Sequence, residues 1–221
     1  CGGATPHAGE IALSLERMHA IEELDGDAMT MTVQAGTPLE TIQNAAAEAG
    51  FRFPLDLGAR GSCNIGGNIS TNAGGNEVIR YGMTRNLVLG VEVVLADGTV
   101  LTSMNKMLKN NAGFDLKQLF IGTEGTLGVV TRAVLRLYPR PLTHFAALCA
   151  LNNLNDVIKF LHHLQLNLAG GLSAFEVMWD DYFNHVLAHI PALKSPFDQE
   201  YPMYVLIEFE GGQEKTDEDT F

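Results

Sequence analysis

Length, composition and charge narrow the kind of protein that this chain can form. Of its 221 residues, 46% are hydrophobic and 18% are charged, which is typical of packed globular domains rather than disordered chains. The 26 acidic and 14 basic side chains give a formal net charge of −12, which repels nucleic-acid phosphates and anionic lipid surfaces, so we expect no nucleic-acid partner. The length favours two modest domains.

Cysteine usage and hydropathy bear on the cellular compartment. The three cysteines, at positions 1, 63 and 149, form no Cys-x-x-Cys motif and cannot all pair, which favours a reducing compartment, so we expect a cytoplasmic protein. No apolar run approaches the roughly 20 residues of a membrane helix and no signal-peptide pattern occurs, so we expect no transmembrane segment. Because the chain opens on CGGATP without a methionine, we expect a piece or processed form of a longer protein.

The first predicted elements are two strands and a helix. Alternation of apolar with small or polar residues predicts strands over residues 11–15 and 29–35. A helix is predicted over residues 37–50. Its start and end signals are a capping box of Thr37 and Glu40, Pro38 at the first helical position, and Gly50 after the last turn.

A hairpin and a short helix are predicted next. Residues 87–103 read as two strands joined by Asp97 and Gly98, a pair favoured in tight turns in which both central residues need positive φ. Residues 116–120 predict a short helix, followed by a glycine-bearing loop over 122–130 that runs into a strand.

A domain boundary is predicted where this strand ends at two prolines, Pro139 and Pro141. After them glycine becomes rarer and strand-like and helix-like runs alternate, which predicts a second α+β domain. Residues 211–221 are polar and acidic, so we expect a disordered end. The last apolar strand runs close to this end, which favours an incomplete second domain.

The stretch GSCNIGGNISTNAGG, residues 61–75, predicts a ligand-binding loop. Glycine loses more backbone freedom on folding than other residues, so such a cluster favours tight turns or a close approach to a ligand. The sequence lacks the lysine of a phosphate loop, the spacing of a dinucleotide fingerprint and the Gly-x-Ser-x-Gly of a hydrolase. Backbone amides and polar side chains could hold a pyrophosphate or a flavin edge, and plain tight turns are an equally supported alternative.

Taken together, several motifs resemble one enzyme family. They are LDLGARGSCNIGGNISTNAGG…RYG, LGVEVVLADGTVL, DLKQLFIGTEGTLGVVT and YPRP, in this order and spacing. The sequence is similar to flavin-dependent oxidoreductases of the vanillyl-alcohol oxidase and p-cresol methylhydroxylase (PCMH) type, and within them to the D-lactate, glycolate and D-2-hydroxyglutarate dehydrogenases. The resemblance is close over about residues 1–141 and loose beyond, and motifs in series are more specific than any single one.

This resemblance implies a fold, a cofactor and the residues that contact it. The fold is α+β, with a PCMH-type FAD-binding domain over residues 1–141 and part of a ferredoxin-like α+β substrate domain over 142–221. Most of the family's first pyrophosphate loop would precede this chain, which leaves open whether the chain retains FAD. The implied cofactor-binding residues are Gly2, Gly3, Pro54, Asp56, Gly58, Ser62, Asn64, Gly66, Gly67, Thr71, Asn72, Ala73, Gly74, Glu124, Gly125, Gly128, Val129 and Val130.

The implied reaction is oxidation of a D-2-hydroxy acid to the 2-oxo acid by hydride transfer to the flavin N5. In this branch the base is a histidine and a His/Glu cluster holds a divalent metal; both are expected downstream of Phe221, so no catalytic or metal-binding residue is assigned here. The partner is a small 2-hydroxy acid, the electron acceptor is not assigned, and a homodimer is an open expectation. The alternatives are other PCMH-type chemistry, such as an alkyl-glycerone-phosphate synthase or a covalent-flavin oxidase, or a catalytically inert FAD-binding fragment.

Three further residues, Arg80, Tyr81 and Cys63, need an interpretation of their own. Arg80 and Tyr81 could face the flavin or a substrate carboxylate, or Arg80 could form a surface ion pair with Glu77 or Glu92. Cys63 stands where the branch often has histidine, and we interpret it as a small packed thiol.

Four histidines are the remaining metal candidates. His185 and His189 have the i, i+4 spacing of metal ligands but lack the glutamate of His-Glu-x-x-His, so we expect both on an exposed helix face. His162 and His163 are adjacent and point to different faces, so we expect both on the surface.

Overall fold

The computed structural model describes residues 5–168 and 170–221. The expected cofactor residues Gly2 and Gly3 lie outside the described residues. Contacts divide the chain into two compact units. The first contains the described residues up to Ala73 together with Met83–Pro139, and the second contains Gly74–Gly82 and Arg140–Phe221.

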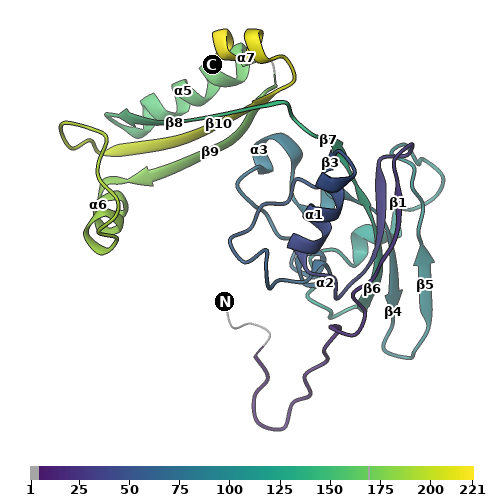
Figure 1. The fold of residues 1–221 in the computed structure, drawn as a ribbon. Helices are drawn as coiled ribbons and strands as arrows, with labels where there is room; N and C mark the ends of the chain where they lie inside the picture. Colours follow the sequence, from purple (N-terminus) through teal and green to yellow (C-terminus); the bar gives the residue numbers. More distant parts are fainter. Residues whose placement is uncertain (1–4, 169) are drawn as a thin grey trace. The chain divides into compact units, whose positions relative to one another are not determined.

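The first unit is built on a five-stranded antiparallel sheet (Figure 1). The strands, in spatial order, are β1 (Ile21–Asp25), β2 (Thr30–Gln34), β6 (Val129–Arg136), β4 (Val88–Val94) and β5 (Val100–Ser103). The central strands form the core, because Met31 and Val33 of β2 and Ala133 and Leu135 of β6 are fully buried. Burial of such side chains is the main favourable term in folding.

Short helices and a small strand pair complete the first unit. They are α1 (Leu39–Glu48), α2 (Ile65–Ser70), α4 (Thr84–Leu87), the 3-10 helix η1 (Leu116–Leu119), and the paired strands β3 (Phe51–Arg52) and β7 (Tyr138–Pro139). Helix α1 buries Leu39, Ile42 and Ala46, which lie on one face at helical spacing. Figure 1 shows α1 and α2 on one side of the sheet.

The predicted strand over residues 11–15 is wrong, and the prediction over 29–35 is confirmed as β2. Residues 11–15 form no regular structure, and Ile11 and Leu13 are 93% and 69% exposed. Alternation shows only that one face could be buried, and here no neighbouring strand covers it. The first strand is β1, whose exposed glutamates hid it from a hydropathy reading.

The predicted helix is confirmed, but its start differs from the prediction. Pro38 is the N-cap of α1 rather than its first helical residue, and its cap position has no side-chain hydrogen bond. The Thr37 hydroxyl instead donates to the carbonyl of Gln34 at 2.8 Å, so the predicted capping box does not form. Gly50 follows the helix with φ of 81°, as predicted for a helix end.

The predicted hairpin is confirmed as β4 and β5, with a different turn. Only Gly98 has a positive φ, of 85°, while Asp97 accepts a hydrogen bond from the amide of Thr99 at 2.9 Å. The amide of Gly98 donates to Leu95 and that of Leu95 to Thr99, which is the pattern of a type I turn followed by a glycine bulge.

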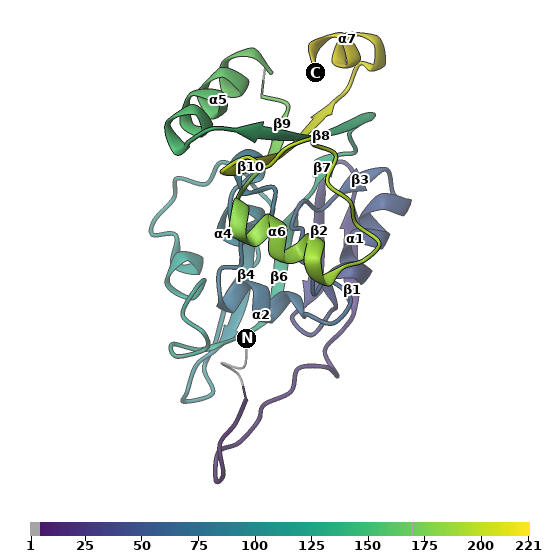
Figure 2. The ribbon, with the colours of Figure 1, turned by 90° about the vertical axis from the view of Figure 1, so that its left-hand side faces the viewer.

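The second unit is an α+β layer around a three-stranded antiparallel sheet in the order β8-β10-β9 (Figure 2). Its elements are α3 (Val78–Tyr81), β8 (Thr143–Leu151), α5 (Leu154–Asn167), β9 (Leu172–Trp179), α6 (Asp180–His189), β10 (Met203–Gly211) and α7 (Glu214–Thr220). Strand β10 lies between β8 and β9, which is the split βαβ order of ferredoxin-like folds.

Packing explains the second unit's helices. Val157 and Leu164 of α5 pack with Val205, Ile207 and Phe209 of β10 in one buried cluster.

The expected disorder over residues 211–221 is wrong, because the structure places α7 there.

The start of α7 is fixed by one carboxylate. Asp217 is buried, and its carboxylate accepts from the Thr143 hydroxyl at 2.7 Å and from the Gln213 amide at 2.6 Å. Composition cannot reveal this pairing, because Thr143 lies 74 residues away in the sequence.

Among the described residues, no helix is both long and apolar enough to span a membrane.

Candidate functional site

The glycine-rich stretch 61–75 contains α2 and runs beside the start of α1. The amide of Leu39 donates to the carbonyl of Cys63 at 3.0 Å, and the amide of Gly66 donates to the carbonyl of Ala35 at 2.7 Å. The turn is therefore held by backbone hydrogen bonds to the segment that joins β2 to α1.

Two neighbouring glycines of α2 have different reasons to be glycine. A Cβ at Gly66 would lie 2.7 Å from the Cβ of Ala35, so Gly66 is required by packing. A Cβ at Gly67 would meet no atom within 4 Å, and Gly67 is exposed. Packing within the protein therefore explains Gly66 but not Gly67. An open, side-chain-free backbone position is what close approach of a ligand requires.

The two glycine-bearing loops predicted from the sequence lie side by side in the first unit. The amide of Gly122 donates to the carbonyl of Ile69 at 3.1 Å, and the amide of Glu124 donates to the carbonyl of Ser70 at 2.9 Å. These bonds join the end of α2 to the loop before β6. The two loops therefore form one continuous backbone surface.

Positive φ angles shape this surface. Asn72 and Glu124 adopt φ of 48° and 53°, conformations rare outside glycine, and Gly122 and Gly125 adopt 88° and 80°. Asparagine tolerates this region better than other non-glycine residues. The Asn72 side chain also accepts from the amide of Arg85 at 2.9 Å, which fixes the turn.

Arg85 is a residue of this site that the sequence analysis missed. Its guanidinium donates to the carbonyl of Ile121 at 2.6 Å, and to the carbonyl of Gln118 at 3.2 Å and its side-chain oxygen. The Gln118 amide in turn donates to Asp115 at 3.1 Å, and hydrogen bonds from Lys117 and Gln118 lower the pKa of Asp115. Arg85 thus ties the 118–121 segment to α4, and no local motif marks it.

Several predicted residues use their side chains within the loop. The hydroxyl of Ser62 donates to Ala59 at 3.3 Å, and that of Thr71 donates to Gly67 at 2.9 Å. Asn64 precedes α2 in extended conformation without a side-chain cap bond.

The segment before this stretch is held in place by packing and one ion pair. Pro54 is buried, whereas Gly58 is exposed. Asp56 forms an ion pair with Arg60 at 2.7 Å.

The remaining predicted residues divide between packing and position. A Cβ at Gly128 would lie 2.6 Å from a methyl of Val93, so this glycine is also explained by packing. Val129 and Val130 begin β6, where Val130 is buried. Gly74, unlike Ala73, belongs to the second unit.

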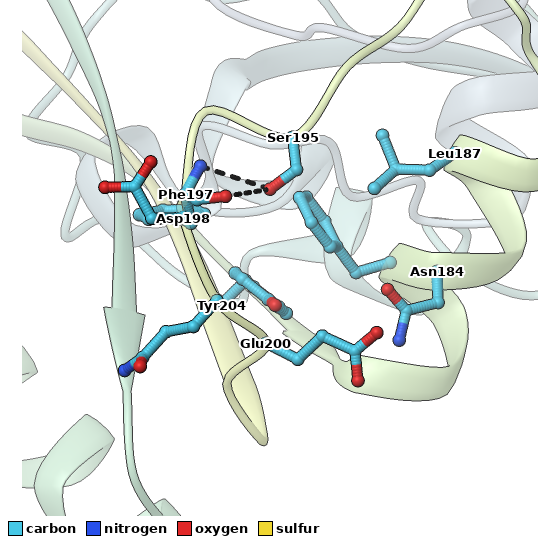
Figure 3. A pocket seen from close by; sticks show the side chains of 9 residues that line it. Asn184, Leu187, Ser195, Phe197, Asp198, Glu200 and Tyr204 are labelled. Atoms are coloured by element: carbon cyan, nitrogen blue, oxygen red, sulfur yellow. Dashed lines mark hydrogen bonds between the residues drawn. The ribbon is translucent and has the colours of Figure 1, made fainter.

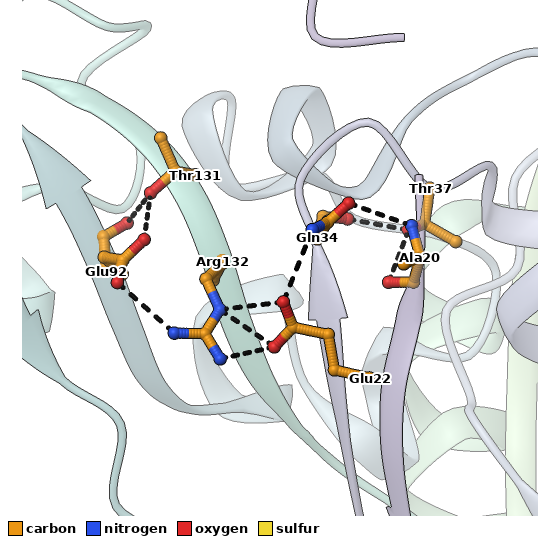
Figure 4. Close-up of polar contacts among 7 residues, drawn as sticks. All are labelled: Ala20, Glu22, Gln34, Thr37, Glu92, Thr131 and Arg132. Atoms are coloured by element: carbon orange, nitrogen blue, oxygen red, sulfur yellow. Dashed lines mark hydrogen bonds and ion pairs between the residues drawn. The ribbon is translucent and has the colours of Figure 1, made fainter. Parts of the chain in front are cut away.

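A separate polar network crosses the sheet of the first unit (Figure 4). Arg132 of β6 pairs with Glu22 of β1 and, at 3.3 Å, with Glu92 of β4. Glu92 also accepts from the Thr131 hydroxyl at 2.8 Å. These carboxylates raise the pKa of Arg132, hydrogen bonding to Glu22 being the first cause. The network consists of side-chain pairs between strands, and in it the Glu92 carboxylate is bound by Arg132 and Thr131.

In the second unit, Arg80 is not paired with Glu92 as one interpretation proposed. Its guanidinium lies 3.4 Å from the carboxylate of Glu210 and donates to the carbonyls of Glu210 and Gly171.

The remaining candidates behave as packing and surface residues. His162, His163, His185 and His189 are all exposed, as predicted. No group of three or more His, Cys, Asp or Glu residues within the described part of the chain could hold a metal. Cys63 is half-buried, and its sulfur lies 3.7 Å from the side-chain oxygen of Asn68.

A cavity of about 210 Å³ lies within the second unit, between α6 and the segment before β10 (Figure 3). Its aromatic wall is Phe183 stacked on Tyr204, with ring centroids 3.9 Å apart. Asp198 and Glu200 add carboxylates to the lining. No residue of the sequence-predicted site lines it.

Comparisons with known proteins define the class of this chain. Residues 1–103 match the FAD binding domain family, and residues 141–220 match the C-terminal domain of FAD linked oxidases. The chain therefore belongs to the FAD-linked oxidases of the PCMH type, as its motifs indicated. The predicted α+β fold class is confirmed.

The chain is similar to D-2-hydroxyglutarate dehydrogenases. It is 45% identical to that of Xanthomonas citri over 96% of this chain and 44% of the relative, and 46% identical to the mitochondrial one of Bos taurus over 95% and 38%. A Schizosaccharomyces pombe protein provisionally named a mitochondrial D-lactate dehydrogenase is 39% identical over 98% and 41%. The chain thus spans less than half the length of these relatives.

Solved structures show the same fold at greater sequence distance. Two structures of alkyldihydroxyacetonephosphate synthase superpose with TM-scores of 0.71 and 0.74 at 20% and 19% identity. Each covers 93% of this chain, and the chain covers 39% and 41% of theirs. At this identity the likeness concerns the fold alone.

Proposed function

We propose that this chain forms the FAD-binding part and part of the substrate domain of an enzyme that oxidises a D-2-hydroxy acid to the 2-oxo acid. The observation that carries the FAD assignment is the hydrogen-bonded joining of the loops 61–73 and 122–128, together with the open backbone position at Gly67. The substrate class is supported by the names of the relatives that match nearly the whole chain. The relation to alkyldihydroxyacetonephosphate synthase, at 19% to 20% identity, gives no comparable support for that chemistry.

The residues present fit a flavin nucleotide. In this proposal the backbone around Gly67 and the turn at Asn72 lie against the cofactor, and Gly122, Glu124 and Gly125 form the second wall. Bound FAD supplies the acceptor for the hydride of the hydroxy acid. The protein's part here is to hold the cofactor in a fixed orientation, since the Asn72 and Arg85 hydrogen bonds preorganise the surface.

The groups that remove the substrate proton and bind a metal are proposed to lie outside this chain. The base and any divalent-metal ligands are proposed to come from the portion of the relatives' length that this chain does not span. For the metal, this is supported by the described residues, among which no group of three or more His, Cys, Asp or Glu could hold an ion. Cys63 and Cys149 are free thiols, which supports a reducing compartment; the cytoplasm is the location we propose, and several eukaryotic relatives are named as mitochondrial. A homodimer stays a prediction that light scattering tests.

The test is a visible spectrum of the purified chain after FAD is added and the excess removed. Retained flavin bands are expected, and they should be much weaker in Gly67→Ala than in Gly212→Ala, a control glycine whose Cβ position is also open. Anaerobic bleaching of the band by D-2-hydroxyglutarate or D-lactate, and not by the L-enantiomers, is expected when the chain is tested together with the portion of the relatives' length to which the base is assigned. Binding without bleaching in that longer protein would favour the inert FAD-binding alternative, and no binding would refute the FAD assignment for this chain.

A further inference from the structure

A buried carboxylate in the second unit is held by two residues from far away in the sequence. Glu210 of β10 is 1% exposed, and its carboxylate accepts a hydrogen bond from the Tyr81 hydroxyl at 3.0 Å. Arg80 lies 3.4 Å from the same carboxylate and donates to the Glu210 carbonyl at 2.8 Å. A buried charge is strongly destabilising when its partner is removed, so these contacts fix α3 against this strand.

The segment that carries Arg80 and Tyr81 is an excursion from the first unit. Residues 74–82 group with the second unit, yet both ends continue into residues of the first. The two ends are tied together there: the amide and hydroxyl of Thr84 donate to the carbonyl of Ala73 at 2.9 and 2.7 Å. The amide of Arg85 also donates to the Asn72 side chain.

The residues that flank the 74–82 segment include the turn at Asn72 and Ala73, which belongs to the proposed flavin surface. Asn72 and Ala73 end the glycine-rich loop, and Arg85 clamps the second loop. A shift of these nine residues, 74–82, is therefore transmitted to the turn at Asn72 and Ala73 through the continuous chain. No contact between the units is needed for this coupling.

We propose that Arg80, Tyr81 and Glu210 form a lock by which the second unit fixes the turn at Asn72 and Ala73, and with it the affinity for FAD. All three are positioning residues that act through the chain at 73–74 and 82–83. The part that concerns FAD rests on the function proposed above, whereas the part that concerns the turn does not.

The experiment compares Glu210→Gln with Glu208→Gln, which removes the same charge from the same strand at a site facing His144 rather than Arg80. Amide hydrogen exchange is measured in the unliganded chain at Ala73, Thr84 and Arg85, whose amides donate to Asn68, Ala73 and Asn72. Glu210→Gln should speed exchange at these three amides by at least about tenfold, because the buried contacts of this side chain to Arg80 and Tyr81 lose their charge assistance. Glu208→Gln should leave it unchanged.

Two further arms keep the result interpretable. Tyr81→Phe keeps the ring and removes one hydrogen bond, so it should give a smaller change of the same sign in a chain that folds. FAD titration should show weaker binding in Glu210→Gln and unchanged binding in Glu208→Gln.

The proposed lock is overturned if exchange rises only in α3, β9 and β10 while the amides of Ala73, Thr84 and Arg85 stay protected. Unchanged FAD affinity in Glu210→Gln would overturn the part that concerns the cofactor. If the wild-type chain binds no FAD, the proposed function fails, and the exchange measurement still decides the lock.

Discussion

A substitution at Gly67 separates the cofactor interpretation from a purely structural one. Gly67 lies in the middle of α2, is exposed, and has no atom within 4 Å of its Cβ position. Alanine in a helix interior is favoured over glycine by roughly 0.5–1 kcal/mol. The free energy of unfolding of Gly67→Ala should therefore rise slightly.

The neighbouring Gly66 supplies the matched comparison. An added Cβ there would lie 2.7 Å from the Cβ of Ala35 and 2.9 Å from its carbonyl oxygen. The backbone would have to move away from the residue that its amide bonds, and such overpacking costs about 1–3 kcal/mol. Adjacent glycine-to-alanine changes should therefore shift stability in opposite directions.

Urea unfolding followed by FAD titration measures both effects. Gly67→Ala should unfold at the same or higher urea concentration than the wild type while binding FAD at least about tenfold more weakly, since about 1.4 kcal/mol corresponds to a factor of ten. If Gly67→Ala loses stability, the conclusion that a Cβ fits at this position without contact is wrong. If Gly67→Ala is stable and its FAD affinity is unchanged, Gly67 is not part of the cofactor surface.

Three other predictions follow from single contacts. Arg85→Ala should lower the free energy of unfolding by about 2 kcal/mol, because charged hydrogen bonds to the carbonyls of Gln118 and Ile121 are lost. Denaturant unfolding measures this change, and a change within experimental error would mean that Arg85 does not hold the 118–121 segment. Hydrogen bonding to Lys106 is the main cause of the lowered pKa of Asp25, so this pair contributes stability above the unfolded carboxyl pKa that is lost as the pH falls through the folded one. Lys106→Met should raise the pKa of Asp25 in a carboxyl-carbon NMR titration, and an unchanged titration would mean that the pair does not form. Ser173 is fully buried with no hydrogen-bond partner for its hydroxyl among the described residues, so Ser173→Ala should stabilise the chain by up to about 1 kcal/mol in thermal unfolding, whereas destabilisation would reveal an unrecognised partner.

Local chemistry explains what the sequence could predict. Gly50 and Gly98 adopt the positive φ that their turns need, and the loops 61–75 and 122–130 stand out because clustered glycines favour tight turns or a close approach to a ligand. That both loops contact one cofactor was implied only through the resemblance to a family, and their hydrogen bonding to each other was not predicted. Spacing alone does not show that Ile69 bonds Gly122.

Long-range contacts explain what the sequence could not predict. Residues 11–15 have a strand pattern without a neighbour to pair with, and the Thr37 hydroxyl donates to the carbonyl of Gln34 instead of accepting from an amide of its own helix. Arg85 looks like a surface residue until the 118–121 segment is brought against it. Likewise, no feature of residues 74–82 indicates that they leave the first unit, because their partner Glu210 is 130 residues away.

The excursion at residues 74–82 also has a consequence for the order of folding. During synthesis the first unit can complete its sheet once β6 has emerged, but α3 must wait for β9 and β10, the strands against which it is held. Closing so long a loop adds little to the entropy cost, which grows only with the logarithm of its length, yet contacts of such separation slow folding. We therefore expect the nascent chain to fold its amino-terminal sheet early and to dock α3 as the late step.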